Sequence, residues 1–294
     1  MRLPRSFTST SIILLPKIAG AMQWKDFWPI SLCNVCSKII SKIVSDRLGR
    51  VLPTLVSPWQ TGFVPGRGIT DNILLTQELV VDLDRRLRHL SLMLKLDMEK
   101  AYDRVEWSFL LFMLRNFGFA EQVVDIFFRL VSNNWFSVLV NGEAAGFFKS
   151  SRGVRQGDPV SPGLFGLVAE FLGRGLHHLL DSQPGRYFVS TGTPVPYLIF
   201  VDDMLTFTRC SEECLNVIKA FLLEYQEASG QRVNVKKSSF FLPSGATSGQ
   251  EQLVTKVLGF HRQLFPFTYL GAPIYKGQRQ GALFDGIVSK MRAH

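Results

Sequence analysis

Long apolar runs, cysteines and charges are all scarce in this sequence, and each scarcity excludes a class of protein. No stretch approaches the roughly 18 uncharged apolar residues of a membrane span, which excludes an integral membrane protein. Four cysteines in 294 residues are too few for a disulfide scaffold. The run Ile12–Leu15 ends at Pro16, too early for the core of a signal peptide. Charged residues make up only 19% and apolar residues 46%, so the chain is globular rather than disordered.

The net charge of +9 is distributed unevenly along the chain. Residues 1–70 hold nine basic and two acidic side chains, and residues 230–294 hold the same numbers. Residues 71–229 hold fifteen basic and twenty acidic side chains. A polyanion would be attracted to both flanks and repelled by the centre, unless cations neutralise the central acids. The pattern is consistent with a protein that binds nucleic acid around an acidic, metal-binding centre. It is equally consistent with solvated surface charge, and the charge distribution alone does not distinguish the two.

Strands and helices are mixed without a regular βαβ alternation, which indicates an α+β fold. Hydrophobic periodicity and capping residues predict helices over residues 30–52, 70–88, 103–118, 120–133, 164–180 and 211–230. Alternation and turn signals predict strands over residues 91–98, 197–201, 204–208, 233–242 and 268–275, with a hairpin over 135–148.

The segment 91–98 is expected to deliver a carboxylate to the end of a strand. Leu92, Leu94 and Leu96 alternate with polar or flexible residues, which is typical of a strand with one buried face. Asp97 follows at the end of this strand, on the face opposite to the leucines.

A second acidic feature lies between two apolar strands. Asp202 and Asp203 occupy the expected tip of a tight hairpin, where Gly or Asn is preferred. Two adjacent carboxylates also repel each other unless a cation lies between them. The pair thus departs both from turn preference and from favourable electrostatics, and departures of this kind usually occur at functional sites. The alternative is an exposed acidic turn on an ordinary hairpin.

Together, Asp97, Asp202 and Asp203 could chelate two Mg²⁺ ions if the sheet brings the strand ends together. Oxygen ligands without accompanying His or Cys favour Mg²⁺. Such a pair of ions supports in-line attack at phosphorus.

The residues around these acids form motifs of a known family. The segments KLDMEKAYDRVEW (95–107), RGVRQGDPVSP (152–162) and FVDD (200–203) resemble the polymerase motifs of reverse transcriptases, and more narrowly those of plant non-LTR (LINE-type) retrotransposons. Further matches occur in family order between residues 12 and 275: LPK (15–17), PISLCN (29–34), QTGFVPGR (60–67), DNIL (71–74), SGQRVN (229–234), KS (237–238) and YLG (269–271).

The resemblance implies a right-hand polymerase fold with a ferredoxin-like palm sheet, helical fingers and a truncated thumb. The reverse transcriptase domain would cover residues 12–275. Its fingers would comprise residues 12–90 and 108–155, its palm would comprise 91–107 and 156–275, and residues 276–294 would begin the thumb. An endonuclease domain and a full thumb are expected to be absent from this chain, and the family implies a nuclear location.

The implied activity is that of an RNA-directed DNA polymerase, a nucleotidyltransferase that takes an RNA template, a DNA primer and dNTPs. Two Mg²⁺ ions, with Mn²⁺ as a possible substitute, would be held by Asp97, Asp202 and the main-chain carbonyl of Met98. Asp203 would complete the acidic cluster. Lys237 would be the catalytic proton donor to pyrophosphate.

The resemblance also implies nucleotide-binding residues. Lys100 and Ala101 would offer backbone N–H groups to the triphosphate. Tyr102 would be the steric gate against a ribose 2′-hydroxyl, unless it is simply a core tyrosine. Gln156 and Gly157 would lie against the incoming nucleotide and the template.

Two positions leave alternatives open. Arg67, in the Gly-rich loop, is expected to clamp the triphosphate or else to be a solvated loop residue. Trp28 stands where the family usually has Arg, which removes a positive contact from the fingers. Trp28 favours the rival hypothesis of a catalytically inactive nucleic-acid-binding remnant. A two-metal phosphodiesterase that uses the same three acids is another rival hypothesis.

Overall fold

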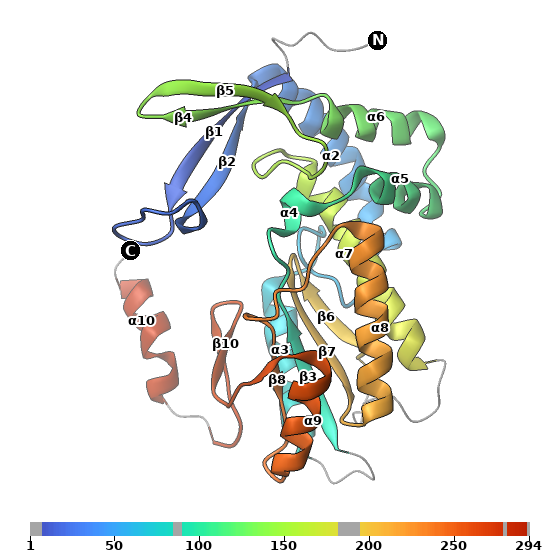
Figure 1. Cartoon of the computed structure of the whole chain (residues 1–294), viewed down its shortest axis with the longest axis vertical. Helices are drawn as coiled ribbons and strands as arrows, with labels where there is room; N and C mark the ends of the chain where they lie inside the picture. The colour runs from blue at the N-terminus through green and yellow to red at the C-terminus, as the bar shows by residue number, and fades with distance from the viewer. Residues whose placement is uncertain (1–7, 85–89, 182–194, 279–280, 293–294) are drawn as a thin grey trace.

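Two β-sheets organise the computed structural model, which describes residues 8–84, 90–181, 195–278 and 281–292 (Figure 1). A four-stranded sheet has the order β2-β1-β4-β5, and a five-stranded sheet has the order β6-β7-β3-β8-β9. The strands are β1 (Ser9–Pro16), β2 (Phe27–Cys33), β3 (Ser91–Leu96), β4 (Trp135–Val140), β5 (Glu143–Lys149), β6 (Tyr197–Phe200), β7 (Asp203–Arg209), β8 (Ser239–Phe241) and β9 (His261–Arg262), with a separate hairpin of β10 (Phe267–Tyr269) and β11 (Ala272–Ile274).

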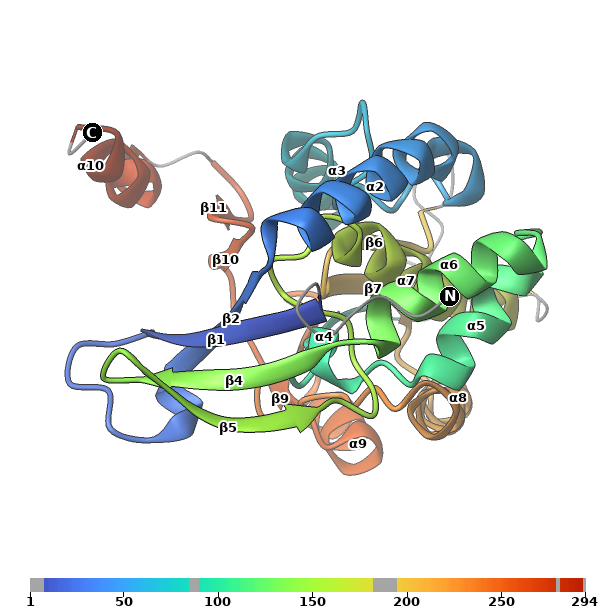
Figure 2. The same cartoon turned by 90° about the horizontal axis from the view of Figure 1, so that it is seen from above.

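Helices surround the five-stranded sheet, and the four-stranded sheet projects from this body (Figure 2). The helices are α2 (Val35–Leu55), α3 (Ile69–Asp82), α4 (Ala101–Arg104), α5 (Trp107–Asn116), α6 (Glu121–Ser132), α7 (Ser161–Asp181), α8 (Glu212–Ser229), α9 (Ser248–Leu258) and α10 (Asp285–Arg292), with 3₁₀ turns η1 (Trp24–Asp26) and η2 (Gly281–Phe284). None of the helices in the described ranges is long and apolar enough to cross a membrane.

The central strand β3 is buried on both faces. Its leucines at 92, 94 and 96 pack in one core with residues of α5, α7 and α8. Met93, on the opposite face, is fully buried with Phe207 and with Leu79 and Val80 of α3. The prediction of a strand with one buried face is therefore wrong, because residues of α3 and of the β10–β11 hairpin share the buried cluster on the second face.

Residues 27–55 correct the prediction of one helix over 30–52. β2 extends to Cys33 because it pairs along its length with β1, and α2 begins only at Val35. The side chain of Asn34 caps this helix by accepting from Cys36 N at 2.9 Å. The region expected to form helical fingers is consequently a mixture of helices and a sheet.

The later strands are shorter than predicted. Residues 232–234 bond to the backbone next to β3, so β8 is confined to Ser239–Phe241 rather than covering 233–242. The segment 268–275 bends into the hairpin β10–β11 instead of forming one strand. The predicted hairpin over 135–148 is confirmed as β4–β5, with its turn at Asn141 and Gly142.

Candidate active site

The ends of β3 and β7 bring the predicted acidic residues to one end of the five-stranded sheet. Leu96 pairs with Met204 in the antiparallel ladder, so one further step of this register sets Asp97 beside Asp203. Asp203 is itself the first residue of β7 and pairs with Phe200. The turn consists of Val201 and Asp202, which corrects the prediction that Asp202 and Asp203 form the tip together.

The acidic groups lie within electrostatic reach of one another. Burial raises the pKa of Asp97, the charge of Asp202 raises it further, and Lys237 opposes both. Burial also raises the pKa of Asp203; Lys95 opposes this effect, while Asp202 and Asp97 add to it. Burial is thus the main cause of both shifts, and the carboxylates of Asp97, Asp202 and Asp203 act on one another.

A segment after α8 fixes the backbone of Asp97. The amide of Asp97 donates to Ser238 Oγ at 3.1 Å, and the amide of Asn234 donates to the Asp97 carbonyl at 2.8 Å. The amide of Glu99 donates to the Arg232 carbonyl at 2.8 Å. Ser238 and Asn234 belong to the motifs KS (237–238) and SGQRVN (229–234), which gave no indication of this role.

The acidic residues do not form a closed metal cage. Among the residues that the structure describes, no three acidic, histidine or cysteine side chains converge into a group that could hold a metal ion. The preformed three-carboxylate cluster expected from the sequence is thus not found among the described residues. The donor chemistry nevertheless fits Mg²⁺, which commonly binds through one or two carboxylates and completes its shell with water and substrate phosphates.

The residues after Asp97 lead into α4 and place an aromatic ring near the acids. Lys100 adopts a left-handed conformation with φ 46°, and Ala101 begins α4. The Tyr102 ring stacks on Phe165 of α7, with centroids 4.7 Å apart and planes at 15°. Burial raises the pKa of the Tyr102 hydroxyl, and the charge of Asp202 raises it further, so Tyr102 also lies within reach of that carboxylate.

The loop before α7 is anchored to β2. The carbonyl of Gln156 accepts from Ser31 N at 3.1 Å, and Gly157 follows as an exposed residue. Beneath them, buried Asp158 bonds to Arg155 and to the hydroxyl of Ser41. This polar network was not predicted from the sequence. Arg155 and Asp158 do lie in the RQGDP segment of the motif at 152–162, but the motif did not indicate that they bond to each other.

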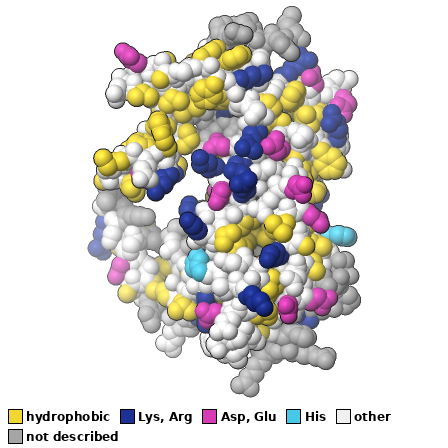
Figure 3. Space-filling model, in the orientation of Figure 1, with side chains coloured by type: hydrophobic (Ala, Val, Ile, Leu, Met, Phe, Trp, Pro, Cys, Tyr) yellow, Lys and Arg dark blue, Asp and Glu magenta, His cyan; other side chains and the backbone are white. Residues whose placement is uncertain are grey.

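The other predicted residues have distinct surroundings. Lys237 is exposed, and its charge acts on Asp97. The guanidinium of Arg67 donates to four main-chain carbonyls, those of Pro53, Val56, Ser57 and Gln60. Trp28 is 53% exposed on β2, with Lys17 Nζ 6.0 Å from its ring centroid. The surface in Figure 3 is hollowed between the parts that carry the two sheets, and Lys and Arg side chains gather around this hollow.

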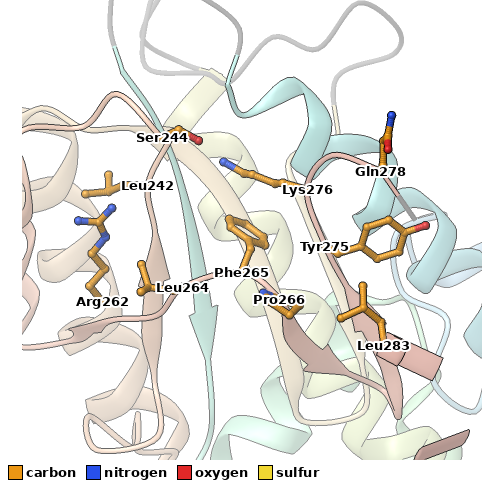
Figure 4. A pocket seen from close by; sticks show the side chains of 10 residues that line it. All are labelled: Leu242, Ser244, Arg262, Leu264, Phe265, Pro266, Tyr275, Lys276, Gln278 and Leu283. Atoms are coloured by element: carbon orange, nitrogen blue, oxygen red, sulfur yellow. The ribbon is translucent and has the colours of Figure 1, made fainter. Parts of the chain in front are cut away.

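A separate cavity lies at the other end of the five-stranded sheet (Figure 4). Leu242, which lines it, follows β8 at the level of the beginning of β3, whereas Asp97 follows the end of β3. Phe265 lies in its middle, and Lys276 Nζ is 4.6 Å from the centroid of that ring. Lys276 also pairs with Asp84 at 2.8 Å, so its charge is compensated.

Comparison with known families and proteins gives consistent matches. The model of the family described as reverse transcriptase (RNA-dependent DNA polymerase) matches residues 17–274. An uncharacterized 149 kDa protein of transposon TX1 from Xenopus laevis is 32% identical over 244 residues, which cover 82% of this chain and 18% of that protein. The Pol polyprotein of the retrotransposable element R2DM from Drosophila melanogaster is 28% identical over 235 residues, covering 80% of this chain and 21% of the polyprotein.

Solved structures share the fold at low sequence identity. Telomerase from Candida tropicalis, in complex with a fragment of telomeric RNA, superposes with a TM-score of 0.62 at 15% identity, over 100% of this chain and 50% of that one. This likeness shows a mixed α+β fold similar to that of telomerase. The chain spans about a fifth of the length of the TX1 and R2DM proteins.

Proposed function

Because the chain belongs to the reverse transcriptase (RNA-dependent DNA polymerase) family and is related to retrotransposon proteins, we propose that it catalyses RNA-directed DNA synthesis. A dNTP would be added to the 3′-hydroxyl of a DNA primer paired with an RNA template. The observation that carries this proposal is the meeting of Asp97 and Asp203 on neighbouring strands, with Asp202 in the adjoining turn. The right-hand arrangement of palm and fingers is part of the same proposal, as is an origin in a plant LINE-type element.

Asp97 and Asp202, with the main-chain carbonyl of Met98, are the groups proposed to hold two Mg²⁺ ions, and Asp203 adds to the negative potential. When bound, the ions lower the pKa of the primer hydroxyl and neutralise the leaving pyrophosphate. The register that sets Asp97 beside Asp203, with Asp202 in the adjoining turn, supports this assignment, because carboxylate oxygens are ligands that Mg²⁺ prefers.

The remaining residues bind and orient the nucleotide. Backbone N–H groups of Lys100 and Ala101 face the triphosphate in this proposal, and Tyr102, held against Phe165, occupies the space that a 2′-hydroxyl would need. Gln156 and Gly157 lie against the incoming nucleotide and the template in this proposal. Lys237, beside Asp97, supplies a proton to pyrophosphate.

Primer extension on an RNA template with Mg²⁺ tests the proposal. Asp97→Asn is expected to lower the rate by about 10³-fold or more, because several kcal/mol of transition-state stabilisation depend on the bound ions. Asp125→Asn is the matched control, since Asp125 is an exposed carboxylate on α6 that pairs with Arg129. Equal rates for Asp97→Asn and the parent would overturn the proposal. Salt-sensitive RNA binding without any extension would also overturn it and would identify a nucleic-acid-binding domain.

A further inference from the structure

The loop between α2 and α3 lies along the free edge of β6, the strand that leads to Asp202. We call residues 57–62 the strap. The amide of Ile199 donates to the Trp59 carbonyl at 2.9 Å, and the amide of Thr61 donates to the Ile199 carbonyl at 3.0 Å. Gln60 and Ile199 form a parallel bridge. The strap therefore satisfies the outer edge of β6 as an additional short strand would.

The strap also touches the backbone of the turn itself. A Cβ atom on Gly62 would lie 2.4 Å from Val201 N and 3.2 Å from the carbonyl carbon of Phe200, so only glycine permits this approach. Val201 has φ 59°, an unfavourable conformation for a β-branched residue. Such a conformation persists only where the surroundings enforce it. The strap contacts Val201, which directly precedes Asp202, and is therefore one of the surroundings that enforce this conformation.

One side chain fixes the shape of the strap. Arg67 Nη1 donates to the carbonyls of Ser57 and Gln60, the second at 2.6 Å. Arg67 Nη2 donates to the carbonyls of Pro53 and Val56, at 3.1 and 3.4 Å, at the C-terminal end of α2. A planar fork of donors can join these two sets of carbonyls, whereas the single ammonium of lysine cannot.

Helix α3 supports the same strand from a second direction. Asn72 is fully buried, and its Nδ2 donates to the Ile199 carbonyl at 3.1 Å. That carbonyl therefore accepts from both Thr61 N and Asn72. The strand before Asp202 is thus held by two elements, and Arg67 orders one of them.

From these contacts we infer that Arg67 is a positioning residue, which ties the strap to α2 and thereby holds the Val201–Asp202 turn in register with Asp97. This inference rests on the proposed function for its catalytic consequence. It assigns Arg67 a different task from clamping the triphosphate, because the terminal nitrogens of its guanidinium are already bonded to the protein.

Amide hydrogen exchange of the protein without added nucleotide or metal tests the positioning directly. Arg67→Ala is expected to speed exchange in residues 197–202 by about tenfold or more, since hydrogen bonds to a charged group are lost. Arg67→Lys should not restore the slow exchange. Exchange in β3 should stay unchanged, as should all exchange in the control Arg47→Ala, which removes an exposed arginine of α2. Unchanged exchange in residues 197–202, or an equal rise in β3, would overturn the inference.

Steady-state extension assays separate the two roles of Arg67. Loss of positioning should raise the Mg²⁺ concentration for half-maximal extension several-fold and leave the KM for dNTP unchanged. A higher KM for dNTP with unchanged Mg²⁺ dependence would instead identify a triphosphate clamp and refute positioning. Because the exchange measurement needs no polymerase activity, an inactive parent protein would contradict the proposed function while the inference about Arg67 is still decided.

Discussion

At the scale of single residues, Tyr102 connects the acidic end of the sheet to the helical core. Its ring is fixed by the stack on Phe165, and its hydroxyl lies within reach of the Asp202 charge. We predict that Tyr102→Val lowers the preference for dNTP over NTP by about 10-fold or more, because a cavity then accepts the 2′-hydroxyl.

The control for this prediction is Tyr102→Phe, which keeps the ring and its stack on Phe165 and should retain the preference. The measurement is single-nucleotide extension with matched dNTP and NTP. If Tyr102→Val prefers dNTP over NTP as strongly as the parent does, Tyr102 is not the steric gate.

Gly230 is a second residue whose identity the structure requires. It ends α8 with φ 72°, and a Cβ there would lie 2.5 Å from the Arg104 carbonyl oxygen. We predict that Gly230→Ala destabilises the protein by roughly 2–4 kcal/mol, since left-handed strain and a backbone clash add together. Gly118→Ala should destabilise the protein by only about 1 kcal/mol, from the left-handed strain alone. Gly118 has φ 83°, but no atom lies within 4 Å of an added Cβ.

Urea unfolding measures both of these free energies. Gly245→Ala serves as the control, since Gly245 has an ordinary φ and open space. Similar losses for Gly230→Ala and Gly118→Ala would show that contact with Arg104 is unimportant.

At the scale of elements, one carboxylate joins the segment directly after α3 to two later segments of the chain. Asp84 accepts from Ser244 N at 2.7 Å and pairs with Lys276 at 2.8 Å. Partial burial raises the pKa of Asp84, but these hydrogen bonds and the Lys276 charge outweigh burial and lower it overall. The ionised form is therefore favoured in the folded state.

The sign of the pH effect follows from this lowered pKa. The stabilisation that ionised Asp84 gives to the folded state is fully present above the pKa of an unfolded aspartate, about 3.9. It is lost as the pH falls through the lower pKa that Asp84 has in the folded protein. We predict that Asp84→Asn reduces stability by about 0.5–1 kcal/mol at pH 7, since the group is exposed and screened. The difference from the parent should shrink below pH 4 in urea unfolding series. A difference that grows on acidification would contradict this account.

At the scale of the whole molecule, we expect nucleic acid to bind in the hollow between the two sheets (Figure 3), because both flanks of the sequence are basic. Lys and Arg side chains gather around this hollow in Figure 3, and the net charge is +9. We predict that affinity for an RNA–DNA hybrid falls at least about tenfold between 50 and 200 mM salt, as expected when two or more phosphates are neutralised.

Fluorescence anisotropy with a labelled hybrid measures this salt dependence. Asp97→Asn should bind at least as tightly as the parent in the absence of divalent ions, because it removes negative charge. A salt-independent affinity would show that the basic flanks do not contact phosphates.

The sequence by itself determined features that depend on near neighbours in the chain. Leucines at alternate positions predicted β3, turn signals predicted the hairpin over 135–148, and capping residues predicted the helix over 211–230 that forms α8. The motifs also singled out the three acidic residues and the family.

Only the tertiary structure decided what distant segments do to one another. Pairing with β1 turned residues 27–33 into a strand, and packing of α3 and the β10–β11 hairpin buried the second face of β3. The register of β3 with β7 set Asp97 beside Asp203 and left Asp202 in the turn. The motif left Arg67 as either a triphosphate clamp or a solvated loop residue, whereas the fold directs its guanidinium to carbonyls of its own chain. Periodicity and capping are local properties of the chain, but pairing partners, burial and the destination of a charged side chain depend on residues that only folding brings near.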